Sequence, residues 1–321
     1  MAQITYAEAA IQAVVDEMRL DPRVFVMGED LRAGAYADVL PEFGPERIRN
    51  TPICESGFIG AGIGAALTGM RPVIEATVAT FLYSAMDQIA NQAAKSRYMF
   101  GGQACVPVVI RSSTYYGTSS AAHHSDRPWG LFAQVPGLKI VVPATPYEAK
   151  GLMRSAIRDG NPVLCFEDCT LLELCGEVPD GDYTVPIGTA AIKRLGSDLT
   201  IVALAAAVKR SLEAADLLAR QGISAEVVDI RTVVPLDRST ILRSVQKTRR
   251  LIVVDPAPLM CSVASEVAAT AAEYAFDCLR APIVRLTAPD VPVPFNPCLE
   301  ALMYPTVEGI AAAAQALCGT V

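Results

Sequence analysis

The sequence predicts an α/β protein with two doubly wound domains, and three observations lead to this fold class. The chain has 321 residues, enough for two domains at a typical size of about 150 residues each. Hydrophobic residues make up 52% of the chain and charged residues only 19%, so it has a large core to bury and is not disordered. Short apolar runs alternate with stretches of helical periodicity, which is typical of parallel sheets covered by helices.

Charge and cysteine content argue against a nucleic-acid-binding, membrane-bound or disulfide-rich protein. The formal net charge of −7 gives no general attraction to nucleic acid or to anionic membranes. No run approaches the ~18 uncharged apolar residues of a membrane-spanning helix, and no basic stretch followed by an apolar one opens the chain. The nine cysteines are odd in number and scattered, which favours reduced thiols. We therefore expect a complete, cytoplasmic protein with no nucleic-acid or membrane partner.

The first domain is expected over residues 1–185. Thr5 and Glu8 have the spacing of a capping box, so the first helix should begin directly after Thr5. A loop at residues 112–128 follows an apolar strand, at the edge where doubly wound sheets usually keep their chemistry. The helices expected in this domain are Tyr6–Arg19, Gly57–Thr68, Ser84–Met99 and Pro146–Arg158. The strands expected are Val24–Met27, Pro72–Ala76, Val106–Arg111, a short one at Val141, and Pro162–Glu167.

The second domain is expected over residues 186–321. Residues 168–197 are rich in Pro and Gly and therefore indicate a connecting segment. A second alternating set follows it. Its expected strands are Leu199–Leu204, Ala225–Asp229, Arg250–Asp255 and Ile283–Leu286, and its expected helices are Val208–Gln221, Ser239–Lys247, Val263–Phe276 and Val307–Leu317.

The Gly-rich stretch at residues 57–69 has two interpretations. Gly60, Gly62 and Gly64 are spaced closely enough to suggest a dinucleotide-binding loop. That fingerprint, however, requires GxGxxG directly after a strand, and its third glycine would fall on Leu67. The pattern favours a helix whose glycines permit close packing against a neighbouring backbone.

Two polar features are candidate catalytic groups. Glu55 directly precedes the apolar helix, where it is either an acid favoured by the helix dipole or a buried carboxylate that needs a partner. His123 and His124 are the only histidines, so imidazole chemistry can come only from their loop. A histidine pair on a loop is more often a polar surface feature than a catalytic one, and the residues alone leave both interpretations open.

Several long blocks resemble the β subunit of the thiamine diphosphate-dependent first component of 2-oxo acid dehydrogenase complexes. They include TPICESGFIGAGIGAAL, GMRPVIEATVATFLYSAMDQIANQAAKSRYMFGGQ, PGLKIVVPATPYEAKGLMRSAIRDGNPV and DIRTVVPLD, in order over nearly the whole chain. The pyruvate dehydrogenase and acetoin dehydrogenase members are the most similar. The resemblance implies a transketolase-like pyrimidine-binding domain followed by a transketolase C-terminal-type domain.

The resemblance also implies roles for individual residues. Glu55 matches the glutamate that hydrogen-bonds the pyrimidine ring of thiamine diphosphate and so activates its amino group as a base. Phe81 matches an aromatic residue that packs on the pyrimidine, and Thr77 stands at the cofactor site where the family commonly has Gln. His124 matches an active-site histidine that contacts the substrate-derived group or helps pass it to a lipoyl carrier. His123 has no counterpart.

The resemblance further implies a structural potassium ion at Ala156, Asp159 and Asn161, since hard oxygen ligands suit such an ion. A plain turn is the alternative, because RDGNP is also favourable turn sequence. The chain has no GDG motif, with which such enzymes hold magnesium and the diphosphate. In the family a separate α subunit supplies that motif in an α2β2 heterotetramer, and a lipoyl acyltransferase core is a further partner.

We therefore expect the β subunit of a thiamine diphosphate-dependent oxidoreductase that is active only with its α subunit. Thr77, Ser84 and Asp126 depart from the family pattern near the cofactor and substrate. Three alternatives remain open. They are a carboligase or transketolase-like half-enzyme that forms acyloins, a non-catalytic partner subunit, and a nicotinamide dehydrogenase built on the glycines at 60–64.

Overall fold

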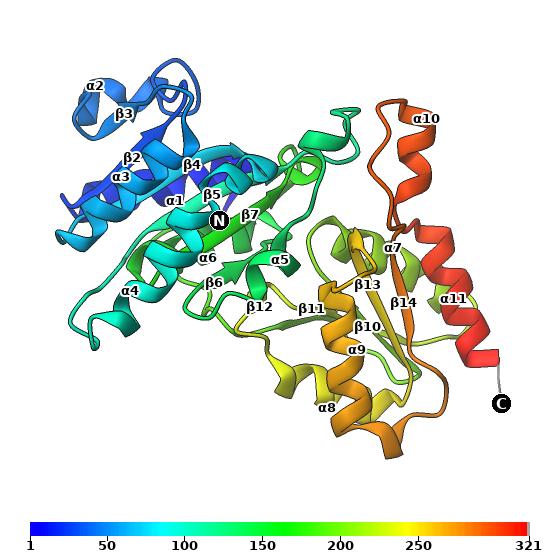
Figure 1. Cartoon of the computed structure of the whole chain (residues 1–321). Coiled ribbons are helices and arrows are strands. Elements are labelled where there is room, and N and C mark those ends of the chain that lie inside the picture. Colours follow the sequence, from blue (N-terminus) through cyan, green and yellow to red (C-terminus); the bar gives the residue numbers. More distant parts are fainter. Residues whose placement is uncertain (320–321) are drawn as a thin grey trace. The chain divides into compact units, whose positions relative to one another are not determined.

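The computed structural model describes residues 1–319, and the last two residues of the expected second domain lie outside this range. The chain divides into two compact units (Figure 1). The first comprises residues 1–115 and 131–187, and the second comprises residues 116–130 and the chain from residue 188 onward. Each unit is an α/β layered structure, so the predicted fold class is confirmed.

The first unit is built on a parallel sheet of strand order β6-β7-β5-β4-β2-β3. The strands are β2 (Val24–Gly28), β3 (Ile48–Asn50), β4 (Arg71–Val78), β5 (Val109–Thr114), β6 (Lys139–Val141) and β7 (Val163–Asp168). The α-helices are α1 (Tyr6–Leu20), α2 (Leu40–Phe43), α3 (Glu55–Leu67), α4 (Ala94–Met99) and α6 (Pro146–Arg158), while α5 (Trp129–Ala133) crosses the division between the units. A small antiparallel pair joins β1 (Ala2–Thr5) to β8 (Cys175–Val178).

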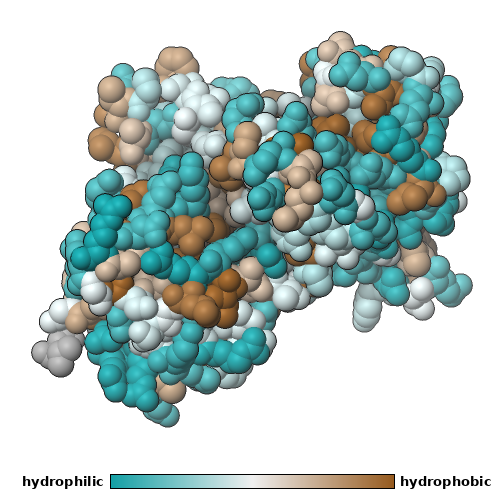
Figure 2. All heavy atoms as spheres, turned by 180° about the vertical axis from the view of Figure 1, so that it is seen from behind, coloured by the Kyte–Doolittle hydropathy of each residue, from teal (hydrophilic) through white to brown (hydrophobic). Residues whose placement is uncertain are grey.

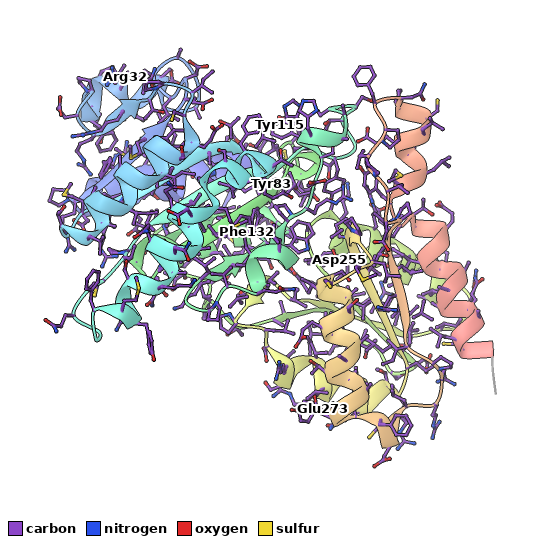
Figure 3. All side chains as sticks on the ribbon, in the orientation of Figure 1. Arg32, Tyr83, Tyr115, Phe132, Asp255 and Glu273 are labelled. Carbon is purple, nitrogen blue, oxygen red and sulfur yellow. The ribbon has the colours of Figure 1, made fainter. Side chains whose placement is uncertain are left out.

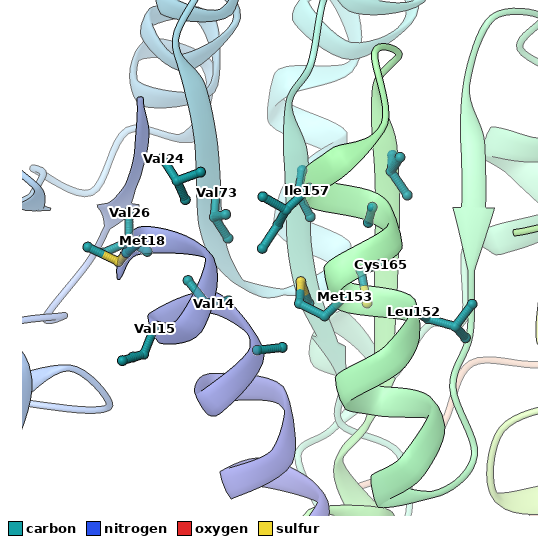
Figure 4. Packing of buried hydrophobic residues seen from close by; sticks show 14 of the residues in the cluster. Val14, Val15, Met18, Val24, Val26, Val73, Leu152, Met153, Ile157 and Cys165 are labelled. Atoms are coloured by element: carbon teal, nitrogen blue, oxygen red, sulfur yellow. The ribbon is translucent and has the colours of Figure 1, made fainter. Parts of the chain in front are cut away.

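The core of this unit lies between the sheet and the paired helices α1 and α6 (Figure 4). Met18 from α1, Val26 from β2, Val73 from β4 and Met153 from α6 are all fully buried in one cluster. The predicted capping box at the start of α1 is confirmed, because the Thr5 side chain accepts from the Glu8 N–H while the Glu8 carboxylate accepts from the Thr5 N–H.

Two predicted elements of the first unit differ from the structure. The single helix expected over Ser84–Met99 is replaced by the 3-10 segment η2 (Ala79–Ala85), the π-helical segment η3 (Gln88–Ala93) and the short α4. The strand expected from Val106 begins only at Val109, because Pro107 has no N–H to donate to a neighbouring strand.

The second unit has a five-stranded sheet of order β14-β13-β10-β11-β9, parallel except for the antiparallel edge strand β9. The strands are β9 (Ala191–Arg194), β10 (Leu199–Ala203), β11 (Ala225–Asp229), β13 (Leu251–Pro258) and β14 (Val284–Ala288), and β12 (Thr232–Val234) follows β11 in the chain. The helices are α7 (Ala206–Ala219), α8 (Arg238–Thr248), α9 (Val263–Tyr274), α10 (Pro297–Glu300) and α11 (Val307–Gly319).

Among residues 1–319, none of the helices is both long and apolar enough to cross a membrane. Hydrophobic side chains reach the surface in separate patches between hydrophilic ones (Figure 2).

Candidate active site

Glu55 is the first residue of α3 and is partly buried. Within residues 1–319 its carboxylate makes no hydrogen bond or ion pair with the protein. The start of a helix stabilises a negative charge through the helix dipole, so an unpaired carboxylate is tolerated there. Glu55 is therefore an available acceptor for a proton donor that is not part of this chain.

Glu29 is a site residue to which sequence analysis gave no role. It follows β2, and its pKa is raised first by burial, then by the negative charges of Glu55 and Asp30. The negative charge of Glu55 is one of the causes of this rise, so Glu29 adds a second carboxylate to the region of Glu55. Two acids in this arrangement favour a ligand that brings a proton or a positive charge.

The glycines that follow Glu55 lie inside α3 and do not form a loop before it. A Cβ atom at Gly62 would lie 2.4 Å from Cδ1 of Ile74 on β4, so only glycine permits this close approach of helix to sheet. Close packing is thus found at Gly62, but against the side chains of Ile74 and Met27 and not against a backbone as predicted. The glycines also lack the position of a dinucleotide-binding loop.

Thr77 and Phe81 lie at the end of β4 and in the η2 segment that continues it. Thr77 is exposed and has φ of +47°, an outlier for a β-branched residue, at a break in the pairing between β4 and β5. Phe81 is partly buried, and its neighbour Tyr83 is marked in Figure 3. Because η2 packs against α3, the structure brings the Phe81 segment to the helix that begins with Glu55.

A buried cluster of charged side chains joins strands β4, β5 and β7. Arg111 donates to Glu75 Oε1 at 2.9 Å and to Glu167 Oε2 at 2.8 Å, and the Tyr36 hydroxyl donates to Glu75 Oε1 at 2.5 Å. Burial raises the pKa of Glu167, whereas the positive charge and hydrogen bond of Arg111 act in the opposite direction. The cluster fixes neighbouring strands at the point where β2 ends, since Gly28, Glu75 and Arg111 are in register.

His123 and His124 belong to the second unit, in the short 3-10 turn η4 (Ala122–His124). His123 is exposed, while His124 is partly buried. Nδ1 of His124 lies 3.0 Å from the carbonyl oxygen of Ser120. A carbonyl can only accept, so Nδ1 carries the proton in the neutral ring and Nε2 carries the lone pair. Glu55, Thr77 and Phe81 belong to the first unit.

The side-chain oxygens of the expected ion site are occupied by protein donors. Asp159 Oδ2 accepts from Lys139, and Oδ1 accepts from the N–H and the side-chain amide of Asn161 at 2.9 and 2.8 Å. Burial alone would raise the pKa of Asp159, but these donors outweigh it and lower the pKa. Both carboxylate oxygens are thus shared with protein donors.

The main-chain oxygens of this segment are also engaged. Arg71 donates to the carbonyls of Ile157 and Asp159 at 2.7 and 3.1 Å, and the buried Ala156 accepts from the N–H of Asp159. A carbonyl has two lone pairs and can hold a second donor or an ion. Potassium at Ala156, Asp159 and Asn161 therefore stays a prediction.

Comparison with known proteins agrees with this geometry. Residues 2–173 match the transketolase pyrimidine binding domain, and residues 188–310 match the transketolase C-terminal domain. The chain is 44% identical to the acetoin:2,6-dichlorophenolindophenol oxidoreductase subunit beta of Bacillus subtilis, covering 98% of this chain and 97% of the relative. Its counterpart from Cupriavidus necator is 46% identical, covering 98% of both chains.

Relatives with other names are almost as similar. The 2-oxoisovalerate dehydrogenase subunit beta of Bacillus subtilis is 43% identical over 99% of both chains. Among solved structures, a split gene transketolase described as an inactive beta4 tetramer has a TM-score of 0.83 at 25% identity and covers 99% of both chains. The chain therefore belongs to the family of β subunits of 2-oxo acid dehydrogenase first components and acetoin oxidoreductases, which is built from transketolase-type pyrimidine-binding and C-terminal domains.

Proposed function

We propose that this chain is the β subunit of a thiamine diphosphate-dependent enzyme that cleaves acetoin or a 2-oxo acid. The observation that supports the proposal most is Glu55, a partly buried carboxylate without a protein partner in residues 1–319. Glu55 is the first residue of α3, and this helix packs against the segment that contains Phe81. When bound, thiamine diphosphate supplies an acidic thiazolium C–H and an aminopyrimidine that can take up its proton. A proton-bearing ring nitrogen is the kind of donor that Glu55 and Glu29 together favour.

Each residue has a defined task in this proposal. Glu55 would hydrogen-bond the pyrimidine ring nitrogen and hold a proton there, which would favour the imino tautomer of the ring, whose exocyclic nitrogen is the base. Phe81 packs on the face of the ring, and Thr77 borders it. His124 uses Nε2 to hold or move a proton at the oxygen of the substrate.

A partner subunit is part of the proposal. Acidic groups dominate the Glu55 region and the chain carries a net charge of −7, so its own charges do not favour an anionic diphosphate. We propose that an α subunit binds the diphosphate with magnesium in an α2β2 heterotetramer and that a lipoyl carrier receives the acyl unit.

The proposal is tested with Glu55→Gln in the complex with the native α subunit. Turnover of acetoin, measured with 2,6-dichlorophenolindophenol as electron acceptor, is expected to fall by about 100-fold or more, because Gln cannot hold the proton as a carboxylate does. Binding of thiamine diphosphate should be retained. Glu46→Gln, which changes an exposed carboxylate paired with Arg49, is the matched control and should leave turnover unchanged. Full activity of Glu55→Gln would refute the proposed role.

A further inference from the structure

The loop of residues 116–130, which carries both histidines, is attached to the second unit by Glu300. This residue ends α10 and is only 2% exposed. Its Oε1 accepts from the main-chain N–H of Gly117 at 2.6 Å, and its Oε2 accepts from the N–H of Ser119 at 2.7 Å. The Tyr304 hydroxyl donates to Oε1 as well, at 3.3 Å. Both carboxylate oxygens are therefore used to hold the loop.

Aromatic packing fixes the same part of the loop. The guanidinium carbon of Arg127 lies 4.9 Å from the ring centroid of Tyr116 and 5.1 Å from that of Tyr304, and the two ring centroids are 4.8 Å apart. Cation–π contacts are strongest when the cation is shielded from water, and Arg127 is only 4% exposed. Burial raises the pKa of Tyr304 to about 12, so its hydroxyl stays protonated and remains a donor to Glu300 at neutral pH.

The other end of the loop reaches Trp129, which is fully buried, and the side chain of Trp129 acts on the pKa of Asp255, which is marked in Figure 3 on β13. The Asp255 carboxylate is fully buried and accepts from the N–H groups of Ala257 and Ala264. Burial raises the pKa of Asp255, and these hydrogen bonds act in the opposite direction. Hydrogen bonds to Glu300 hold the start of the loop, and burial of Trp129 places its other end inside the protein.

Between these ends, two residues of the loop have backbone conformations that are unfavourable for residues other than glycine. Ser119 has φ of +56° and Ala121 has φ of +64°, and neither is a glycine. Backbone conformations with positive φ cost about 1–3 kcal/mol each for residues other than glycine. The residue between them is Ser120, whose carbonyl oxygen holds the Nδ1–H of His124. The orientation of the imidazole therefore depends on a strained segment.

We propose that Glu300 is a positioning residue for His124. Glu300 fixes the N–H of Ser119, the next residue directs its carbonyl oxygen at Nδ1 of His124, and this contact sets the direction of Nε2. The inference rests on the proposed function, since it is His124 that acts on the substrate. The C-terminal domain thereby contributes a buried carboxylate to the geometry of the active-site loop.

Hydrogen exchange on the full chain tests the contact itself. In Glu300→Gln, one carboxylate oxygen becomes an NH2 group that cannot accept, so one of the two loop N–H groups loses its partner. Exchange of the amide that loses its partner, Gly117 or Ser119, is expected to be about tenfold faster, as loss of a charge-assisted hydrogen bond implies. Glu308→Gln on α11, an exposed carboxylate, is the matched control and should leave it unchanged. Unchanged exchange in Glu300→Gln would overturn the proposal.

Kinetics of the complex with the native α subunit distinguish positioning from general structural damage. Glu300→Gln should lower kcat for acetoin, as His124→Ala should. KM for acetoin and the affinity for thiamine diphosphate should stay unchanged. A loss of cofactor affinity, or a normal kcat, would overturn the proposal. If Glu300→Gln does not fold, Tyr304→Phe removes one donor to the same carboxylate and should give a smaller change of the same kind. An inactive wild-type complex would refute the proposed function, while the exchange result would still decide the loop contact.

Discussion

Thr77 shows how a single backbone conformation can mark a functional position. Its φ of +47° places a β-branched side chain in the left-handed region, where the Cβ atom approaches the following carbonyl. Strained residues of this kind persist only where the surroundings hold them, and they gather at binding sites. Thr77 lies at the exposed end of β4, next to the segment of Phe81.

We expect Thr77→Gly to increase the free energy of unfolding by about 1 kcal/mol. Glycine removes a conformational cost of about 1–2 kcal/mol, and the greater freedom of the unfolded chain offsets about 0.4–1 kcal/mol of that gain. Urea denaturation of the full chain measures the change. Thr68→Gly is the control, because Thr68 has φ of −93° and gains no relief. Lower stability of Thr77→Gly would mean that side-chain contacts of Thr77 outweigh its strain.

At the scale of elements, the close packing of α3 on β4 depends on Gly62 more than on the other glycines of the helix. A Cβ atom at Gly62 would lie 2.4 Å from Cδ1 of the fully buried Ile74, whereas one at Gly64 would have no atom within 4 Å. Gly62→Ala is expected to lose about 1 kcal/mol, since overpacking costs about 1–3 kcal/mol and exceeds the gain in helix propensity. Gly64→Ala should gain about 0.5–1 kcal/mol, because it improves helix propensity without a clash.

Urea denaturation of the separately purified chain compares the two variants. Opposite signs of the change are the expected result. Equal effects of both substitutions would contradict the close approach of α3 to β4, and a stabilised Gly62→Ala would show that Ile74 moves aside without cost.

Elements with a complete local pattern could be predicted from the sequence. Strand Ala225–Asp229 and helix Pro146–Arg158 have the predicted bounds, and α1 begins after Thr5 because the capping box is a local signal. The segment expected as one helix over Ser84–Met99 could not be predicted in this way. Its division into 3-10, π and α turns depends on packing against α3, which no local pattern records.

At the scale of the molecule, the sequence predicts only those candidate site residues that lie in blocks similar to the family. Glu55, Phe81 and His124 are recognisable from short blocks of sequence. The residues that fix the histidine loop are not, because Gly117 and Glu300 are 183 positions apart and nothing near either residue signals the contact. Similarly, Arg111 becomes a buried charge only through its two acidic partners on neighbouring strands.

The complete cofactor site is expected to require two different chains. Thiamine diphosphate joins a pyrimidine that can donate a hydrogen bond to a strongly anionic tail, and this chain offers carboxylates at Glu29 and Glu55 with a net charge of −7. Such a surface suits the pyrimidine and repels the diphosphate. Calorimetric titration with thiamine diphosphate and Mg²⁺ should therefore show binding to the complex with the α subunit and at least about 100-fold weaker binding to this chain alone, equivalent to about 2.7 kcal/mol. Equal affinity in both samples would show that this chain itself grips the diphosphate, and the division of the cofactor between two subunits would have to be abandoned.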